Sequence, residues 1–424
     1  MGLTRLIKST LMESMSPDKP SLTAKEAAAR LGVKRATLYA YVSRGLLHRS
    51  LADDGRASRF DADEIEAFRA GRRRRAEGEL DAVVSTALTS VRDGELRIRG
   101  KDLVALVLAG ADFEAVVDCL WGVSPTGAWA HARTLQKVIA SVQKRLPSAC
   151  TSLDRLRVTV SVASAADPLR FDLSATAVHT AGRALLSAMV DGLPLQGRVN
   201  DNATRIQDRL WPRLTTRRTN TERRGALNAA LALLVDHGMA TSTLGARVAA
   251  SVRADPYSVV LAGLGVVGGA LHGAASTAVH ELFSDAETAS DASDAVGRAL
   301  RRTGTAPGHG HAVYRSADPR YLALSRLLDQ AWSNDPRLSI THAVRDVIAS
   351  RTEAVPNIDL ALGALTFLAG MPANSGEAIF AIARTAGWLA HAIEEYSEAP
   401  LRFRPRARYR GRQSIRSTST ERLT

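Results

Sequence analysis

Residues 379–396 read IFAIARTAGWLAHAIEEY, a stretch that combines a long apolar helix pattern with one arginine in its interior. Arg384 has Trp388 at i+4 and His391 at i+7, so the three side chains share one helix face. A guanidinium group on an apolar helix is costly unless an anion or an internal carboxylate meets it. The stretch therefore predicts a buried helix that carries part of an anion-binding or catalytic site.

The same helical spacing of Ala, Leu and Val continues through the chain from about residue 80. Strand-like alternation is rare apart from GELRIRG at 94–100. The 424 residues are enough for two or three domains, and a hydrophobic fraction of 45% suffices for a large core. We therefore expect an all-α body of many helices without a 20–50-residue repeat.

Positive charge gathers at the two ends of the chain. Residues 1–75 carry 16 Lys and Arg against 9 Asp and Glu, and residues 401–424 carry 8 Arg against 1 Glu. The intervening residues are nearly neutral, although the whole chain has a net charge of +13. This distribution indicates a polyanion-binding appendage on an otherwise ordinary globular protein.

The N-terminal stretch SLTAKEAAARLGVKRATLYAYVSRGLLHRS (21–50) predicts two short helices around a turn at Gly32. Thr23 and Glu26 fit a capping box, the second helix is expected from about Lys34 to Arg44, and ADEIEAFRA (62–70) predicts a third. Over residues 22–70 the chain resembles helix-turn-helix proteins of the MerR or excisionase type, which implies a small winged DNA-binding domain. The alternative is a helical packing module with a solvated basic face.

The resemblance places the second helix in the major groove of DNA. It implies that the positions at or near the start of this helix contact DNA: Lys34, Arg35, Thr37, Tyr39 and Tyr41.

Several polar residues stand among small or apolar neighbours in the body. They are His237, His272, His311, Arg320, Asp359, Arg384 and Arg404. Each has an ordinary structural explanation: a core histidine, a helix-capping aspartate, or an arginine paired with an internal glutamate. Together they suit an anionic substrate and proton transfer. His309 and His311 lack nearby cysteines or an H-E-x-x-H pattern, so no metal site is expected.

At this point the body resembles the citrate synthase family, over residues ~80 to 411. The resemblance rests on blocks in the family's order: GELRIRGKDL (94–103), FEAVVDCLWG (113–122), SVRADPYSVVLAGLGVVGGALHGAAS (251–276), GHGHAVYRSADPR (308–320), PNIDLALGAL (356–365), IFAIARTAGWLAHAIEE (379–395) and RPRARYRG (404–411). It implies an all-helical protein that condenses acetyl-CoA with oxaloacetate.

The resemblance also implies the role of each residue. His272, His311 and Asp359 would be catalytic, with Asp359 as the base that takes a proton from the acyl-CoA methyl group. The remaining four would bind oxaloacetate: His237, Arg320, Arg384 and Arg404. The acyl-CoA enters as a co-substrate, so the resemblance implies no metal and no permanently bound cofactor.

The domain organisation expected from the resemblance is a homodimer with a large and a small domain in each subunit. We assign residues 80–272 and 373–411 to the large domain and 273–372 to the small one. Residues 21–71 form the helix-turn-helix domain, 72–79 a basic linker, 1–20 a flexible start and 412–424 a disordered tail. Two cysteines and no secretory signal favour the cytoplasm. The uncharged stretch 259–279 contains five glycines and His272, which argues for a buried glycine-rich helix and against a membrane span.

The chain departs from the family pattern around the oxo-acid pocket. Gly238 and Ala240 stand where Glu and Asn are usual, Ser276 replaces Asn, and His309 replaces an aromatic residue. Such changes alter specificity or rate. Two alternatives therefore stay open: a 2-methylcitrate synthase that uses propionyl-CoA, and a DNA-binding regulator whose synthase-like body senses a metabolite.

Overall fold

The computed structural model describes residues 21–43, 47–51, 58–66, 68–69, 83–92, 94–125, 129–198, 203–269, 272–310, 313–314 and 318–403. The chain divides into two compact units, Met1–Ser85 and Thr86–Thr424. Each unit has its own hydrophobic core.

The first unit contains β1 (Ser21–Thr23), α1 (Ala24–Leu31), α2 (Arg35–Ser43), β2 (Ser50–Leu51) and β3 (Ser58–Asp61). The predicted capping box is confirmed, because Thr23 and Glu26 bond reciprocally at the start of α1, and Gly32 ends α1 with φ of 65°. The strands form an antiparallel sheet in the order β1-β3-β2. Residues 62–66 are helical, with the Asp61 carboxylate accepting from the amide of Glu64 at 3.1 Å.

The second unit begins with a small antiparallel sheet of three strands, β4 (Thr89–Arg92), β5 (Glu95–Ile98) and β6 (Lys101–Asp102). The predicted strand within 94–100 is therefore confirmed as β5, where Leu96 and Ile98 point into the core. Thr89 pairs with Ile98 across the sheet, so the start of the unit is fixed beside its core.

Helices make up the rest of the second unit, as the all-α expectation required. The first group is α4 (Leu103–Leu108), α5 (Phe113–Trp121), α6 (Arg133–Gln143), α7 (Ser152–Ala166), α8 (Ala175–Gly192), α9 (Ile206–Leu214), α10 (Thr221–Leu233), α11 (Thr241–Ser251) and α12 (Pro256–Val267). The second is α13 (Ala275–Ser284), α14 (Ala292–Thr303), α15 (Pro319–Ala331), α16 (Pro336–Ala349), α17 (Ile358–Leu368) and α18 (Ser375–Tyr396), with a 3-10 turn at Ala289–Asp291.

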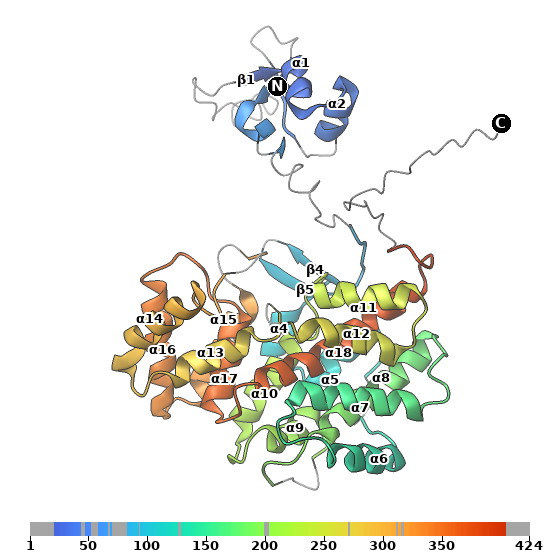
Figure 1. Cartoon of the computed structure of the whole chain (residues 1–424), viewed down its shortest axis with the longest axis vertical. Helices are drawn as coiled ribbons and strands as arrows, with labels where there is room; N and C mark the ends of the chain where they lie inside the picture. Colours follow the sequence, from blue (N-terminus) through green and yellow to red (C-terminus); the bar gives the residue numbers. More distant parts are fainter. Residues whose placement is uncertain are drawn as a thin grey trace, which may run out of the picture. The chain divides into compact units, whose positions relative to one another are not determined.

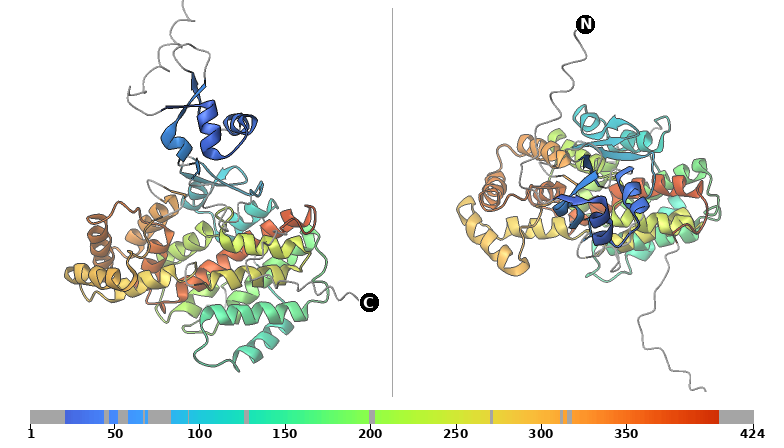
Figure 2. Two further views of the ribbon diagram at one scale, coloured as in Figure 1. Left: turned by 45° about the horizontal axis from the view of Figure 1, so that its top comes forward. Right: turned by 90° about the horizontal axis from the view of Figure 1, so that it is seen from above.

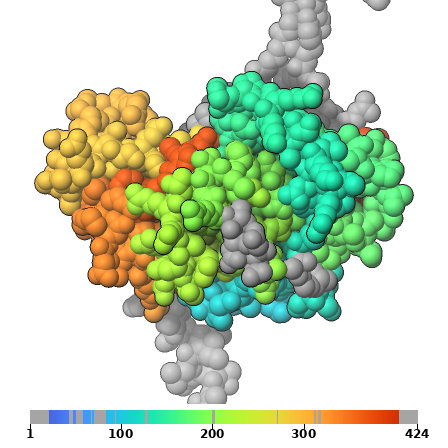
Figure 3. Space-filling view, turned by 90° about the horizontal axis from the view of Figure 1, so that it is seen from below, coloured from blue at the N-terminus to red at the C-terminus, as the bar shows by residue number. Residues whose placement is uncertain are grey.

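The helices of this unit gather in two groups. Helices α13 to α17, yellow to orange, lie together at one end and α6 to α8 lie at the other, with α10 between them and packed on α15 (Figure 1). Both views of Figure 2 keep this division, and the surface in Figure 3 shows the yellow and orange residues as a lobe beside the green ones. The red helix α18 packs on α11 and α12 and also contacts α13 and α17, so it joins the two groups.

The glycine-rich stretch 259–279 is not one helix. Helix α12 ends at Val267, and α13 begins at Ala275. The expected tight packing is present, because a Cβ atom on Gly263 would lie 2.5 Å from the Trp388 ring of α18. No helix among the described residues is long and apolar enough to cross a membrane.

Candidate active site

Asp359 lies in the first turn of α17. The side chain of Asn357 caps this helix by accepting the backbone N–H of Asp359 at 3.0 Å. Asn357 performs the capping, and the Asp359 carboxylate accepts no hydrogen bond from the described residues. Burial raises the pKa of Asp359 to about 6, against the opposing effect of Arg320 and Arg384. A carboxylate in this state suits general-base catalysis near neutral pH.

Arg320 lies in the first turn of α15 and is almost completely buried. Its guanidinium group donates to both carboxylate oxygens of Asp318, from Nε at 3.0 Å and from Nη2 at 2.8 Å. Asp318 also accepts the backbone N–H of Ile358 at 3.0 Å. This carboxylate therefore holds the starts of α15 and α17 together and brings Arg320 beside Asp359.

Arg384 is buried in the middle of α18, as its sequence context predicted. Its Nε donates to the carbonyl of Leu234 at 2.8 Å, and its guanidinium carbon lies 4.6 Å from the centre of the Phe380 ring. The two terminal nitrogens make no hydrogen bond or ion pair with the described residues. Burial lowers the pKa of Arg384 to about 10, so the group stays positively charged and can bind an anion.

His272 precedes α13 by a short turn, and its Nε2 lies 3.0 Å from the Ser242 hydroxyl in the first turn of α11. The ring meets Phe380 edge to face, with 5.5 Å between ring centres. Burial and the positive charge of Arg384 lower the pKa of His272 below its usual value. The imidazole is therefore neutral at neutral pH and can donate a hydrogen bond without carrying charge.

His237 follows α10 in a tight turn, and its Nε2 lies 3.0 Å from the Tyr314 hydroxyl. Burial raises the pKa of Tyr314 to about 12, so this hydroxyl keeps its proton. Asp236, directly before His237, is fully buried and accepts the amide of Gly238 at 3.1 Å. Although burial favours its neutral form, the interactions with His391 and Arg384 lower the pKa of Asp236 to about 2.

Five of the seven predicted body residues therefore lie in one electrostatic neighbourhood: His237, His272, Arg320, Asp359 and Arg384. His311 and Arg404, the other two, lie outside the described residues. His309 is partly buried and hydrogen-bonds the Pro307 carbonyl at 3.0 Å through Nδ1. In the part of the chain that the structure describes, no three His, Cys, Asp or Glu side chains are grouped to hold a metal ion.

In the first unit, the predicted DNA-contacting residues divide into two sets. Lys34 and Arg35 are exposed, whereas the ring of Tyr39 packs on Phe60 and that of Tyr41 on Phe68, 6.5 and 5.1 Å between centres. Thr37 is partly buried. The two tyrosines are partly buried and pack against the core of this unit, whereas the basic pair is exposed.

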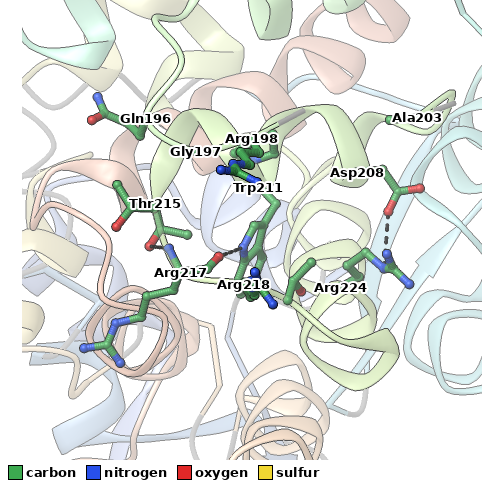
Figure 4. A pocket seen from close by; sticks show the side chains of 13 residues that line it. Gln196, Gly197, Arg198, Ala203, Asp208, Trp211, Thr215, Arg217, Arg218 and Arg224 are labelled. Carbon is green, nitrogen blue, oxygen red and sulfur yellow. Dashed lines mark hydrogen bonds and ion pairs between the residues drawn. The ribbon is translucent and has the colours of Figure 1, made fainter. Parts of the chain in front are cut away.

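A cavity of about 750 Å³ lies apart from these residues, beside α9 and the loop after it. Figure 4 shows Arg198, Arg217, Arg218 and Arg224 around Trp211 in this cavity. Arg224 is paired with Asp208 at 3.5 Å. None of the residues that line the cavity belongs to the predicted catalytic set.

Sequence reasoning missed several residues that shape the site, namely Ser242, Tyr314, Asp318, Asp236 and Thr89. Three of them had a detectable signal. Asp236 and Ser242 lie within DHGMATST (236–243), and Asp318 precedes a proline at a helix start, which is a capping pattern. Thr89 has no local signal, because its partner Asp236 lies 147 residues away in the sequence.

The geometry defines an acid–base site for an anionic substrate. Among the described residues it offers a carboxylate with a raised pKa and no hydrogen-bond partner, a neutral imidazole, and an arginine whose terminal nitrogens have no partner. This class of site removes a proton from carbon or oxygen while cations hold the substrate.

Comparison with protein families identifies the two parts of the chain. Residues 80–406 match the family "Citrate synthase, C-terminal domain", and residues 21–73 match the family "Helix-turn-helix domain". The chain belongs to the citrate synthase family, with a helix-turn-helix domain at its N-terminal end. Citrate synthases are transferases that use acetyl-CoA as a substrate and need no permanent cofactor.

Curated relatives cover both citrate and 2-methylcitrate synthases. The chain is 27% identical over 361 residues to 2-methylcitrate synthase 1 of Corynebacterium glutamicum, covering 78% of this chain and 94% of the relative. It is 28% identical over 358 residues to a 2-methylcitrate synthase of Mycobacterium tuberculosis, covering 78% and 89%. A citrate synthase of Haloferax volcanii is 34% identical over 196 residues, which cover 45% of this chain and 52% of the relative.

Solved structures show the same fold. Citrate synthase from Thermotoga maritima superposes with a TM-score of 0.64 at 23% identity, over 81% of this chain and 98% of that one. Citrate synthase from Thermoplasma acidophilum, solved as a ternary complex with carboxymethyl coenzyme A and oxaloacetate, also gives 0.64 at 23% identity, over 79% and 95%. These likenesses confirm the predicted citrate synthase fold.

Proposed function

We propose that the second unit condenses an acyl-CoA with oxaloacetate or a related 2-oxo acid and then hydrolyses the thioester to release CoA. The observation that carries this proposal is Asp359, a carboxylate without a hydrogen-bond partner among the described residues and with a pKa of about 6. Such a group takes a proton from the acyl carbon at neutral pH. The ionised form returns when the proton leaves, so the cycle can repeat.

The neutral imidazole of His272 would stabilise the enolate. If Ser242 donates its hydroxyl proton to Nε2, the proton of the ring sits on Nδ1 and can be donated to the thioester oxygen. The negative charge that develops on this oxygen is then met by a preorganised donor. His311, which lies outside the described residues, is assigned to the 2-oxo carbonyl by its position in the family motif.

The substrate carboxylates would bind to the arginines. Arg384 has two terminal nitrogens without partners in the described part of the chain, and a guanidinium fork meets a carboxylate with two parallel hydrogen bonds. Arg320 acts electrostatically on Arg384 and lies 5.9 Å from the centre of the Tyr314 ring, whose hydroxyl contacts His237. Arg404 completes the proposed set from the motif alone.

The test is a CoA-release assay on the full chain with acetyl-CoA and propionyl-CoA, each with a panel of 2-oxo acids. Release that requires both an acyl-CoA and oxaloacetate supports the proposal. A higher kcat/KM for propionyl-CoA would assign the chain to 2-methylcitrate synthesis, the activity for which two of the relatives above are named. Release no faster than the background hydrolysis with every oxo acid would refute the proposal.

We also propose that the first unit binds DNA, because its match to helix-turn-helix domains coincides with exposed basic side chains at the start of α2. Arg35 and Arg49 both act electrostatically on Tyr39, so α2 and the chain entering β2 bring positive charge to one place. This arrangement suits contacts to DNA phosphates on either side of a recognition helix.

A mobility-shift titration at several salt concentrations tests this second function. Each lost phosphate contact should reduce the slope of log K against log salt by about 0.9. Lys34→Gln/Arg35→Gln should therefore lower the slope, and the exposed pair change Arg301→Gln/Arg302→Gln in the second unit is the matched control. No shift of genomic fragments at low salt would refute DNA binding.

A homodimer, the division of the body at residues 273–372, and a cytoplasmic location belong to the same proposal. The dimer is supported by the family motif around Arg404. The location is supported by Cys119 and Cys150, which are both free thiols.

A further inference from the structure

A chain of buried polar and charged groups adjoins the proposed active site through Asp236. Asp236, Arg247, His391 and Glu395 are all completely buried. His391 lies between Asp236, at 3.4 Å from Nε2, and Arg247, at 3.0 Å from Nδ1. Arg247 then pairs with Glu395 at 2.9 Å. Since Arg247 can only donate to Nδ1, the imidazole proton lies on Nε2 and is donated to Asp236.

This network reaches three separate segments of the chain. At one point Asp236 accepts the amide of Gly238 and so fixes the turn that presents His237. At another, Glu395 accepts two hydrogen bonds from Arg402, at 2.6 and 2.5 Å. Arg402 is two residues before Arg404, the proposed substrate ligand.

The third segment is the start of the second unit. The hydroxyl of Thr89 donates to the Asp236 carboxylate, and the amide of Ala87 donates to Glu394 at 2.8 Å. Glu394 in turn pairs with Arg247 at 2.6 Å. The residues that directly follow the helix-turn-helix unit are therefore bonded to the same groups that support His237.

Stability alone does not account for this arrangement. Replacing a buried ion-pair network by apolar residues of equal volume is often neutral or stabilising, so buried charges are weak evidence for stability. A bonded network favours one geometry, because its members lose their partners if the others move. Among the described residues, Asp236 Oδ1 is the atom of its carboxylate that has no hydrogen-bond partner, so the network holds Asp236 through Oδ2. The network of Asp236, His391, Arg247 and Glu395 ends at the turn that carries His237. This position indicates that the network fixes the orientation of His237.

We propose that Asp236, His391, Arg247 and Glu395 are positioning residues of the condensation reaction, and that Thr89 locks the entry segment of the body to them. The inference rests on the proposed function. The network orients His237 towards the 2-oxo acid and holds the chain that leads to Arg404. Among the described residues, none of its hydrogen bonds reaches His272 or Asp359, the residues assigned to the acyl-CoA, so the KM values of the two substrates should respond differently to its loss.

The experiment measures initial rates of CoA release by Thr89→Val, with each substrate varied in turn. The change removes one hydroxyl donor and keeps the volume of the side chain. We expect KM for the 2-oxo acid to rise about tenfold, because small displacements of a ligand-orienting group have effects of this size or larger. KM for the acyl-CoA should change less than about twofold, and Thr89→Ser should restore the wild-type values.

Thr341→Val is the matched control. Thr341 is also buried, but its hydroxyl donates to the Leu338 carbonyl of its own helix at 2.8 Å and should leave both KM values unchanged. A wild-type KM for the oxo acid in Thr89→Val, an equal rise for both substrates, or no restoration by Thr89→Ser would overturn the inference. If Thr89→Val does not fold, Glu395→Gln carries the same test: a wild-type KM for the oxo acid, or an equal rise in KM for both substrates, would overturn the inference.

The two proposals fail separately. If the wild-type chain turns over and Thr89→Val behaves like it, only the positioning role falls. If the wild-type chain releases no CoA, the proposed function falls, and thermal stabilisation by oxaloacetate becomes the readout of the network. If the network orients His237, oxaloacetate should raise the Tm of Thr89→Val less than the Tm of the wild-type chain. Equal stabilisation of the two proteins, or of neither, overturns the inference too.

Discussion

Replacing Asp359 by asparagine should make the protein more stable and inactive at the same time. In the folded protein, burial raises the pKa of Asp359 from 3.8 to about 6. This rise corresponds to about 3 kcal/mol by which folding disfavours the carboxylate relative to the acid. Asparagine has nearly the same shape and carries no charge, so Asp359→Asn removes that cost without leaving a cavity.

The difference in stability between Asp359→Asn and wild type depends on pH. Well below pH 3.8 the Asp359 side chain is protonated in both the folded and the unfolded chain, so its ionisation has no effect on stability. Between about pH 4 and 6 the unfolded chain loses the proton first, and the free energy of unfolding falls as pH rises. Asp359→Asn should therefore exceed wild type by roughly 0.5 kcal/mol at pH 4 and by about 3 kcal/mol at pH 8.

Chemical denaturation of both proteins at the two pH values measures this difference. Asp294→Asn is the matched control, because Asp294 also lies in the first turn of a helix but is exposed. CoA release by Asp359→Asn should fall about 10³-fold, the range of a lost general base. A stability difference that does not grow between pH 4 and pH 8 would refute the reasoning that burial sets the basicity of Asp359.

Three further outcomes follow from the site and its supports. For wild type, kcat/KM should decrease as pH falls through about 6, because the base must be ionised, and a profile that is flat down to pH 5 would contradict the assignment. Ser242→Ala should lower kcat about tenfold with little change in the oxo-acid KM, since it loses the hydrogen bond to His272, and steady-state kinetics will detect this. Gly370→Ala should lower the Tm more than Gly304→Ala, measured by thermal unfolding. Both glycines have positive φ, but only at Gly370 does the new Cβ meet a side chain, 2.3 Å from Arg217 Nε, and equal losses would contradict this contact.

The local features of the fold could be predicted from the sequence. The capping box at Thr23, the left-handed Gly32 and the strand within 94–100 depend on residues close together in the chain, and the structure confirms them. The helix carrying Arg384 was predicted from its apolar spacing alone. Patterns of this kind follow from backbone geometry, which acts over one or two turns.

The support of the site could not be predicted in this way. Asp236 bonds Thr89 and His391, which lie 147 and 155 residues away. Helix and strand patterns relate residues only a few positions apart, so no local pattern connects Asp236 with Thr89 or His391. The single helix expected over 259–279 was wrong for a related reason: the chain turns after Gly268 to bring His272 to Ser242, and apolar composition does not record that turn.

The site is built where several helices begin. Arg320, Ser242 and Asp359 occupy the first turns of α15, α11 and α17, and His272 directly precedes α13. Helix N-termini carry partial positive charge, which favours an anionic substrate and a neutral imidazole but would also weaken a carboxylate base. Two features oppose that weakening at Asp359. Asn357 takes over the capping role, and burial disfavours the ionised form more strongly than the arginines favour it. The same environment therefore suits the proposed binding of two substrate carboxylates, and it keeps one carboxylate of its own basic enough for the proposed proton removal.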